Sequence, residues 1–125
     1  MRIELGHLPD KRLSPNARLH HMELYKAKRD AKEEMMLLVL ERGRPQQAIE
    51  KAHITITWVA KDKRRRDADN LFAALKATID GLVEIGLLVD DDAMHVSYTL
   101  RYERGDKDNT IIEVEEVGYV PVEEV

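Results

Sequence analysis

The chain of 125 residues contains no cysteine, one tryptophan and one phenylalanine, and its aromatic fraction is 5%. Without cysteine there are no disulfides, thiolate ligands or cysteine nucleophiles, so a bound metal must be held by oxygen or imidazole. Long apolar runs are also missing, because the longest, Met35–Leu40, has six residues. A bilayer-spanning helix needs about 20 apolar residues, and no basic-then-apolar leader opens the chain. We therefore expect a cytoplasmic protein with no membrane segment.

The composition is that of a folded globular protein. Hydrophobic residues make up 43% of the chain and charged residues 35%, which argues against a disordered acidic chain. No internal repeat, low-complexity tract or flexible linker interrupts the sequence. A chain of this length is expected to form one core. We therefore predict a single domain over residues 1–125.

The charge of the chain is unevenly distributed along its length. Residues 1–66 contain 16 Lys and Arg against nine Asp and Glu, whereas residues 67–125 contain four against 15. The formal net charge of -4 therefore divides into +7 for the first part and -11 for the second. A cationic surface binds polyanions by releasing counterions, and carboxylates hold divalent cations. The alternative interpretation is a solvated surface of uneven charge.

Hydrophobic periodicity predicts two helices and four strands. Apolar residues at spacings of three and four predict helices over residues 20–41 and 70–85. Alternation of apolar and polar residues predicts the strands. These cover residues 2–5, 53–60, 94–102 and 110–117. Residues 105–109 predict a hairpin turn between the last two strands. The order β-α-β-α-β-β predicts an α/β (α+β) fold with a mixed sheet of about four strands and two main helices.

Two aspartates follow the basic stretch Lys61–Arg66. Asp67 and Asp69 are two positions apart at the end of an extended segment, so their side chains point to the same side. Mg²⁺ typically takes one or two carboxylates together with water and phosphate oxygens. The adjacent arginines would attract that phosphate. The alternative interpretation is that an aspartate caps the helix that follows.

A second acidic cluster comprises Asp90, Asp91 and Asp92. Its alternative interpretation is a solvated turn between a helix and a strand. Lys76 lies two helical turns after the first aspartate pair and on the same face. It is either a group that stabilises a negative transition state or an ordinary exposed lysine. His95 is predicted to be exposed, because strand alternation places it opposite the core.

Residues 64–96, RRRDADNLFAALKATIDGLVEIGLLVDDDAMHV, resemble the RusA-type Holliday-junction resolvases, phage-derived members especially. The shared pattern is a run of arginines, D-x-D-N-L, a helix with a lysine and D-G/A-L, a glycine, and aspartates before a strand. LSPNARLHH near the N-terminus resembles the Pro/Asn-containing loop of the same family. The match covers about thirty residues closely and most of the chain loosely.

The resemblance implies a homodimeric, Mg²⁺-dependent endodeoxyribonuclease that cuts four-way DNA junctions, with Mn²⁺ as a substitute ion. It implies a cytoplasmic protein that is nucleoid-associated or phage-encoded. The catalytic and metal-binding residues that it implies are Asp67, Asp69 and either Asp91 or Asp92. In familiar members the catalytic lysine stands where this chain has Ala73, so Lys76, one turn later, is the corresponding electrostatic helper.

The arms of a junction are expected to lie on basic residues of the first part of the chain. Their phosphate positions and branch shape, rather than base identity, would be recognised. The predicted DNA-binding residues are Lys11, Arg12, Asn16, Arg18, Lys26, Arg29, Arg64, Arg65 and Arg66.

An unbroken helix over residues 70–85 would be about 24 Å long, so the two acidic clusters of one chain would lie at opposite ends. One hypothesis is that the helix breaks near Gly81. The other is that two chains pair these helices antiparallel through an apolar stripe formed by Phe72, Ile79 and Val83. The second is favoured, because a twofold junction requires two equivalent cuts.

Two further functions remain open from the sequence. One is a general metal-dependent nuclease for flaps or duplex DNA. The other is a non-catalytic DNA-binding dimer in which the aspartates serve as caps and turns.

Overall fold

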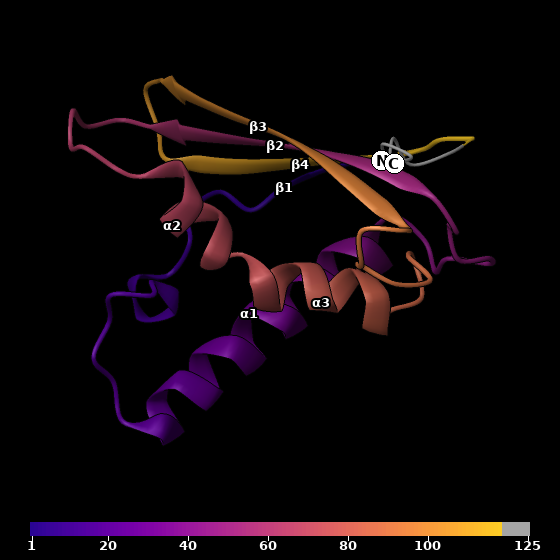
Figure 1. The fold of residues 1–125 in the computed structure, drawn as a ribbon, viewed down its shortest axis with the longest axis horizontal. Helices are drawn as coiled ribbons and strands as arrows, with labels where there is room; N and C mark the ends of the chain where they lie inside the picture. Colours follow the sequence, from indigo (N-terminus) through magenta and orange to yellow (C-terminus); the bar gives the residue numbers. More distant parts are fainter. Residues whose placement is uncertain (119–125) are drawn as a thin grey trace, which may run out of the picture.

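A computed structural model describes residues 1–118. It combines one four-stranded mixed sheet with helices (Figure 1), so the predicted fold class and element order are confirmed. The strands are β1 (Arg2–Glu4), β2 (Ala52–Ala60), β3 (Val96–Arg104) and β4 (Asn109–Glu116). The helices are α1 (His21–Glu41), α2 (Ala68–Ala73), α3 (Lys76–Glu84) and the short 3-10 helix η1 (Lys11–Leu13).

The sheet has the strand order β1-β4-β2-β3. β2 runs parallel to β3 and antiparallel to β4. The predicted hairpin between the last two strands is therefore wrong, because β4 pairs on the other side of β2. Ile54, Ile56 and Trp58 of β2 are fully buried, whereas β3 ends in the charged residues Arg101 and Glu103, which suit an exposed sheet edge. The most apolar strand thus occupies the centre, and Trp58 is a core residue.

Parallel pairing of β2 and β3 requires a crossover connection. β2 ends at Ala60, which pairs with Arg104 at the end of β3. The connection between the two strands must therefore span the full length of the sheet before β3 begins. This crossover connection contains α2 and α3 (Figure 1).

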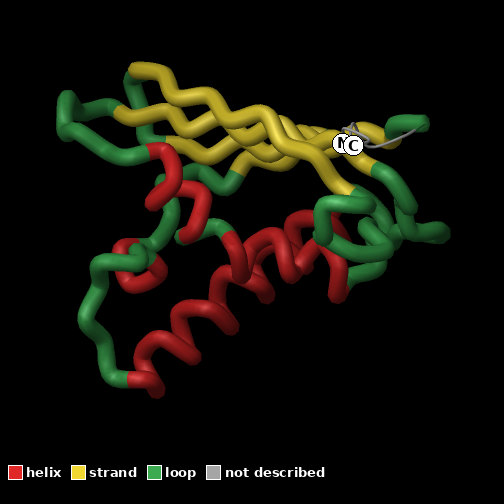
Figure 2. The backbone as a smooth tube through the Cα atoms, viewed as in Figure 1, coloured by secondary structure: helices red, strands yellow, loops and turns green. Residues whose placement is uncertain are grey.

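All helices lie on one face of the sheet (Figure 2). Apolar side chains of α1 and α3 pack with those of the sheet into one cluster, which includes Met35, Val39 and Leu82. Polar side chains occupy the other face, where the His53 ring contacts the hydroxyls of Ser97 and Thr99 at 2.7 and 2.8 Å. This division explains the alternation in β2 and β3.

The predicted helix over residues 70–85 is divided into α2 and α3. The break falls at Ala74 and Leu75, ahead of Gly81. Leu75 is 1% exposed and belongs to the core cluster. We infer that burial of this leucine determines where the helix bends.

The apolar stripe predicted as a dimer surface is used within the chain. Ile79 is 2% exposed, and Val83 packs against the core cluster. The Phe72 ring contacts that of Tyr98 edge-on at a centroid distance of 4.8 Å. Ile79 is therefore not available as a contact between two chains, and the predicted homodimer stays a prediction.

The third predicted strand begins later than expected, at Val96 in place of Met94. Met94 is 63% exposed, so it is not a core residue. Within residues 1–118, no helix combines the length and the apolar character needed to cross a membrane.

Gly81 sets the distance between α3 and α1. A Cβ atom at this position would lie 2.7 Å from the carbonyl oxygen of Lys32 and 3.1 Å from Cβ of Met35. Gly81→Ala should therefore lower the free energy of unfolding by about 1–3 kcal/mol through overpacking, although alanine has the higher helix propensity. Urea denaturation followed by circular dichroism measures the change.

Gly118→Ala is the matched control, because nothing lies within 4 Å of a Cβ atom added there. Its stability should equal that of the parent chain. A Gly81→Ala protein as stable as the parent would show that the two helices do not pack this closely.

Candidate functional site

The loop that leads from β2 to α2 is fixed by its last arginine. Arg66, whose side chain is 16% exposed, donates hydrogen bonds to both carboxylate oxygens of Asp62 at 2.8 and 3.1 Å and to the Tyr102 hydroxyl at 3.0 Å. The contact with Asp62 raises the pKa of Arg66 and lowers that of the aspartate. Arg64 and Arg65 remain exposed. The loop therefore presents these two guanidinium groups from a constrained backbone.

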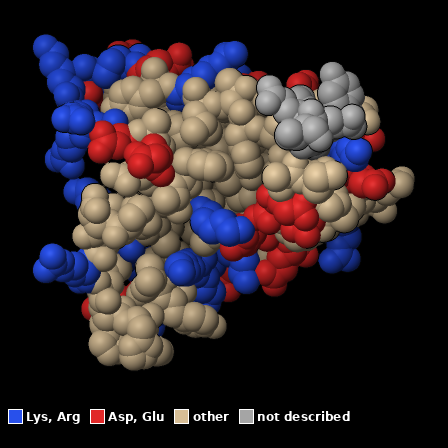
Figure 3. All heavy atoms as spheres, in the orientation of Figure 1, with Lys and Arg blue, Asp and Glu red and all other residues tan. Residues whose placement is uncertain are grey.

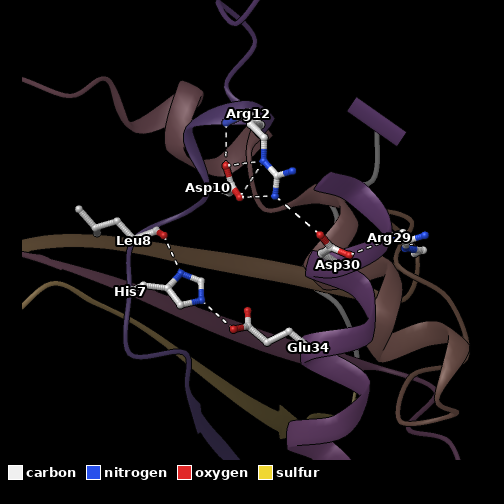
Figure 4. Close-up of polar contacts among 7 residues, drawn as sticks. All are labelled: His7, Leu8, Asp10, Arg12, Arg29, Asp30 and Glu34. Atoms are coloured by element: carbon white, nitrogen blue, oxygen red, sulfur yellow. Dashed lines mark hydrogen bonds and ion pairs between the residues drawn. The ribbon is translucent and has the colours of Figure 1, made fainter. Parts of the chain in front are cut away.

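The loop between β1 and α1 is fastened to α1 by polar contacts (Figure 4). His7 Nε2 lies 2.8 Å from the Glu34 carboxylate. Arg12 Nη2 donates to Asp10 at 2.8 Å and lies 3.7 Å from the Asp30 carboxylate. Arg12, predicted to bind DNA, is therefore paired with two carboxylates of its own chain.

These two loops together line a groove of about 530 Å³, which we call the basic groove. Its lining includes Lys11 and Asn16 from the first loop and Arg64, Arg65 and Asp67 from the second. In the space-filling view, Lys and Arg side chains gather at the left edge, over the loop between β2 and α2 (Figure 3). The fold thus brings predicted DNA-binding residues from distant segments to one surface, beside a predicted metal ligand.

The carboxylates of Asp67 and Asp69 have few partners. Asp67 occupies the N-cap position of α2, but its side chain makes no capping hydrogen bond. Its nearest ionic contact, at 3.5 Å, is with Arg65, whose side chain is 91% exposed. The exposed Asp69 carboxylate has no hydrogen bond or ion pair with any described residue. Helix capping therefore does not account for this pair. Asp69 lies in the first turn of α2 and not in an extended segment, so the predicted geometry, in which an extended backbone points both side chains to the same side, is wrong.

The second acidic cluster has the contacts of a structured turn. Asp90 Oδ1 accepts a hydrogen bond from the Asp91 amide at 2.7 Å. Asp92 Oδ1 accepts one from the Met94 amide at 2.9 Å and lies 2.6 Å from His95 Nδ1. This contact lowers the pKa of Asp92 and raises that of His95. The His95 side chain is 26% exposed, so this histidine lies outside the core as predicted but is partly covered.

Lys76 is the first residue of α3. It joins this helix to Asp90–Asp92, which we call the acidic turn. Its Nζ donates to Asp80 at 2.8 Å and to Asp91 at 2.6 Å. The hydrogen bond to Asp80, followed by that to Asp91, raises the pKa of Lys76, and the lysine lowers the pKa of Asp91. Asp91 is thus neutralised by an ammonium group. The i,i+4 spacing of Lys76 and Asp80 was a sequence signal for this ion pair.

The two acidic clusters do not meet within one chain. Among residues 1–118, the only group of three metal-ligating side chains with atoms within 4.8 Å of one another is Asp90, Asp92 and His95. Asp67 and Asp69 do not join it. A cation shared between the clusters would therefore require a second copy of the chain.

The remaining predicted DNA-binding residues lie around the basic groove or beyond it. Arg29 lines a neighbouring groove on α1, and Arg18 and Lys26 are exposed. Sequence reasoning missed Lys28 and Lys32, which line the same neighbouring groove. The signal that could have identified them was the spacing of one helix face, because Lys28 lies three positions after Tyr25, and Lys32 lies three after Arg29.

Comparison of the chain with models of known protein families and with curated proteins finds no match. The resemblance to the RusA-type resolvases consequently remains a prediction from the sequence motifs.

His7 attaches the loop between β1 and α1 to helix α1 in a pH-dependent way. Its Nδ1 faces the Leu8 carbonyl at 2.7 Å and its Nε2 faces Glu34, and only an imidazolium donates both hydrogen bonds. Burial lowers the pKa of His7, but these hydrogen bonds outweigh burial and raise it above 6.5. Because the folded-state pKa is raised, this stabilisation is present below the unfolded-state pKa and is lost as the pH rises through the folded-state pKa.

Glu34→Gln should therefore lower the pKa of His7, as measured by NMR titration. At about pH 5.5 the free energy of unfolding of the variant should be lower than that of the parent by at most about 1 kcal/mol, because the His7–Glu34 pair is exposed. At about pH 9 the difference should be smaller, because His7 is then uncharged. Glu33→Gln, an exposed neighbour without a contact to His7, is the control. An unchanged His7 titration in Glu34→Gln would contradict the assignment.

Proposed function

We propose that the chain is a Mg²⁺-dependent endodeoxyribonuclease that acts on branched DNA, with four-way junctions as the preferred substrate. The observation that carries this proposal is the basic groove. Lys11 and Asn16 line it together with Arg64, Arg65 and Asp67, although some fifty positions separate the two segments. Cationic side chains and amides bind phosphate oxygens, and here a carboxylate borders the same groove.

Asp67 and Asp69 are the residues that would hold Mg²⁺ in this proposal. Both are exposed, and neither carboxylate is engaged in capping α2. Two carboxylates with water and phosphate oxygens are a typical ligand set for this ion, and Mn²⁺ takes the same ligands. When bound, the ion lowers the pKa of a coordinated water and stabilises charge on the cleaved phosphate.

The protein residues have separate parts in this reaction. Lys11, Arg64 and Arg65 attract and position the DNA backbone. Arg66 holds the loop that carries two of these groups through its bonds to Asp62 and Tyr102. Positioning of a phosphodiester next to its nucleophile supplies much of the catalysis in phosphate chemistry.

In this proposal Lys76 of α3 compensates the charge of the acidic turn. Its ammonium neutralises Asp91, and so reduces the repulsion between the acidic turn and an approaching phosphate. Participation of Asp91 or Asp92 in the same metal site as Asp69 requires a homodimer in which the turn of one chain meets α2 of the other. That assembly is part of the proposal.

A non-catalytic DNA-binding protein is the second candidate. It is favoured by the separation of the two acidic clusters within one chain, because among residues 1–118 neither Asp67 nor Asp69 belongs to a group of three closely spaced metal-ligating side chains. A general nuclease would differ from a junction-selective one in cutting a linear duplex as well as a four-way junction of the same sequence.

Asp69→Asn should reduce Mg²⁺-dependent cleavage of a four-way junction by about 100-fold or more, since even residues that only support metal ligands commonly contribute 10–100-fold. Junction binding in EDTA should be unchanged or tighter, because the substitution removes a negative charge beside the phosphate. Gel assays of cleavage and binding with Mg²⁺, and with EDTA, measure both effects.

Asp106→Asn is the matched control, because Asp106 is exposed in the turn between β3 and β4. It should cleave as the parent does. Junction binding without cleavage in the parent protein, at any Mg²⁺ concentration, would favour the non-catalytic candidate. Loss of folding in Asp69→Asn would show a structural role for the residue.

A further inference from the structure

A second groove, of about 630 Å³, lies between the first half of α1, the loop before it, and the start of α3. We call it the tyrosine groove, after Tyr25 in its lining. Ser14 and Ala74 line both this groove and the basic groove, so the two adjoin. Its volume lies within the range of ligand-binding pockets, about 300–1,000 Å³.

The groove is apolar along part of its wall and has an aromatic ring on α1. Leu19, Leu24, Ala73 and Ala77 line it. Tyr25 is 62% exposed, and its ring stacks on no other ring among residues 1–118. An exposed aromatic ring beside apolar side chains offers a stacking surface for a planar group.

Cationic side chains outnumber carboxylates in the lining of the groove, although Lys76 is paired with Asp80 and Asp91. Lys28, Arg29, Lys32 and Lys76 line it, against the single carboxylate of Asp80. Lys28 has no ion pair with any described residue, whereas Lys32 pairs with Glu84 at 2.7 Å and Arg29 contacts Asp30 at 3.3 Å. Because residues three and four apart share a helix face, Lys28 and Arg29 lie on the same side of α1 as Tyr25. The groove therefore combines a stacking surface with phosphate-binding groups.

We propose that the tyrosine groove binds a single-stranded segment of DNA, with a base stacked on Tyr25 and the adjoining phosphates on Lys28 and Arg29. A charged groove with aromatic side chains is how proteins bind single strands without sequence preference. The proposal rests on the proposed function and extends it, because nucleotides unpaired at a branch point could enter this groove while a duplex arm occupies the basic groove. Single-stranded DNA would thus be a ligand in its own right.

Fluorescence anisotropy of a labelled oligothymidine, measured in EDTA with the full chain, tests the proposal. Stacking contributes about 1–3 kcal/mol per base, so Tyr25→Ala should bind at least about fivefold more weakly. Tyr25→Phe keeps the ring and should bind within about twofold of the parent. Leu37→Ala is the control, because Leu37 is a 61% exposed residue of α1 outside this groove.

Lys28→Gln tests the phosphate contact separately. Each lost contact should reduce the slope of log affinity against log salt concentration by roughly 0.7 for a single strand. Any of three results would overturn the proposal. Tyr25→Ala could bind oligothymidine as tightly as the parent does, or Tyr25→Phe could bind as weakly as Tyr25→Ala. The third result is that Leu37→Ala lowers the affinity as much as Tyr25→Ala does.

The two proposals fail in different ways. If junction cleavage persists but the parent binds no oligothymidine, the tyrosine groove is not a single-strand site. If oligothymidine binds in the expected Tyr25-dependent way but Mg²⁺ produces no cleavage, the groove assignment stands and the nuclease proposal fails.

Discussion

The parallel pairing of β2 with β3 determines where the charged clusters of this molecule lie. Parallel neighbours cannot be joined by a tight turn, so the chain has to cross one face of the sheet between them. Residues 61–95 make that crossing, and α2 and α3 occupy most of it. The basic loop and Asp67 leave one end of β2, whereas the acidic turn at Asp90–Asp92 enters β3 from the other end. One topological requirement therefore separates the two acidic clusters.

The two clusters differ in how their charge is compensated. Asp91 is paired with Lys76, and Asp92 with His95, so the acidic turn is stabilised by its own chain. Asp67 has only a long contact with the exposed Arg65, and Asp69 has no ion pair among residues 1–118. A carboxylate that has no close ion pair with its own chain remains available to a cation. This contrast is why we assign the cation site of a single chain to the start of α2.

Much of the fold follows from local sequence patterns, and the exceptions involve contacts between distant residues. The bounds of α1 and β2 were predicted closely from spacing and alternation, because each pattern reflects one buried face. Strand pairing was not, since nothing in the turn at residues 105–108 shows that β4 pairs with β2. The division of the second helix at Leu75 also depends on the core that this leucine enters. The candidate residues Asp67, Arg64 and Lys11 were identified from the sequence. Their common groove and the Lys76–Asp91 ion pair depend on tertiary structure.

The central claim is that the aspartates at the start of α2 form the cation site beside the basic groove. Paramagnetic broadening by Mn²⁺ in the amide spectrum of the ¹⁵N-labelled protein tests it most directly, because broadening falls steeply with distance from the ion. The account predicts that substoichiometric Mn²⁺ broadens the signals of residues 67–70 first, and that Asp69→Asn removes this effect. Broadening confined to residues 90–95, where Asp90, Asp92 and His95 lie together, would contradict it.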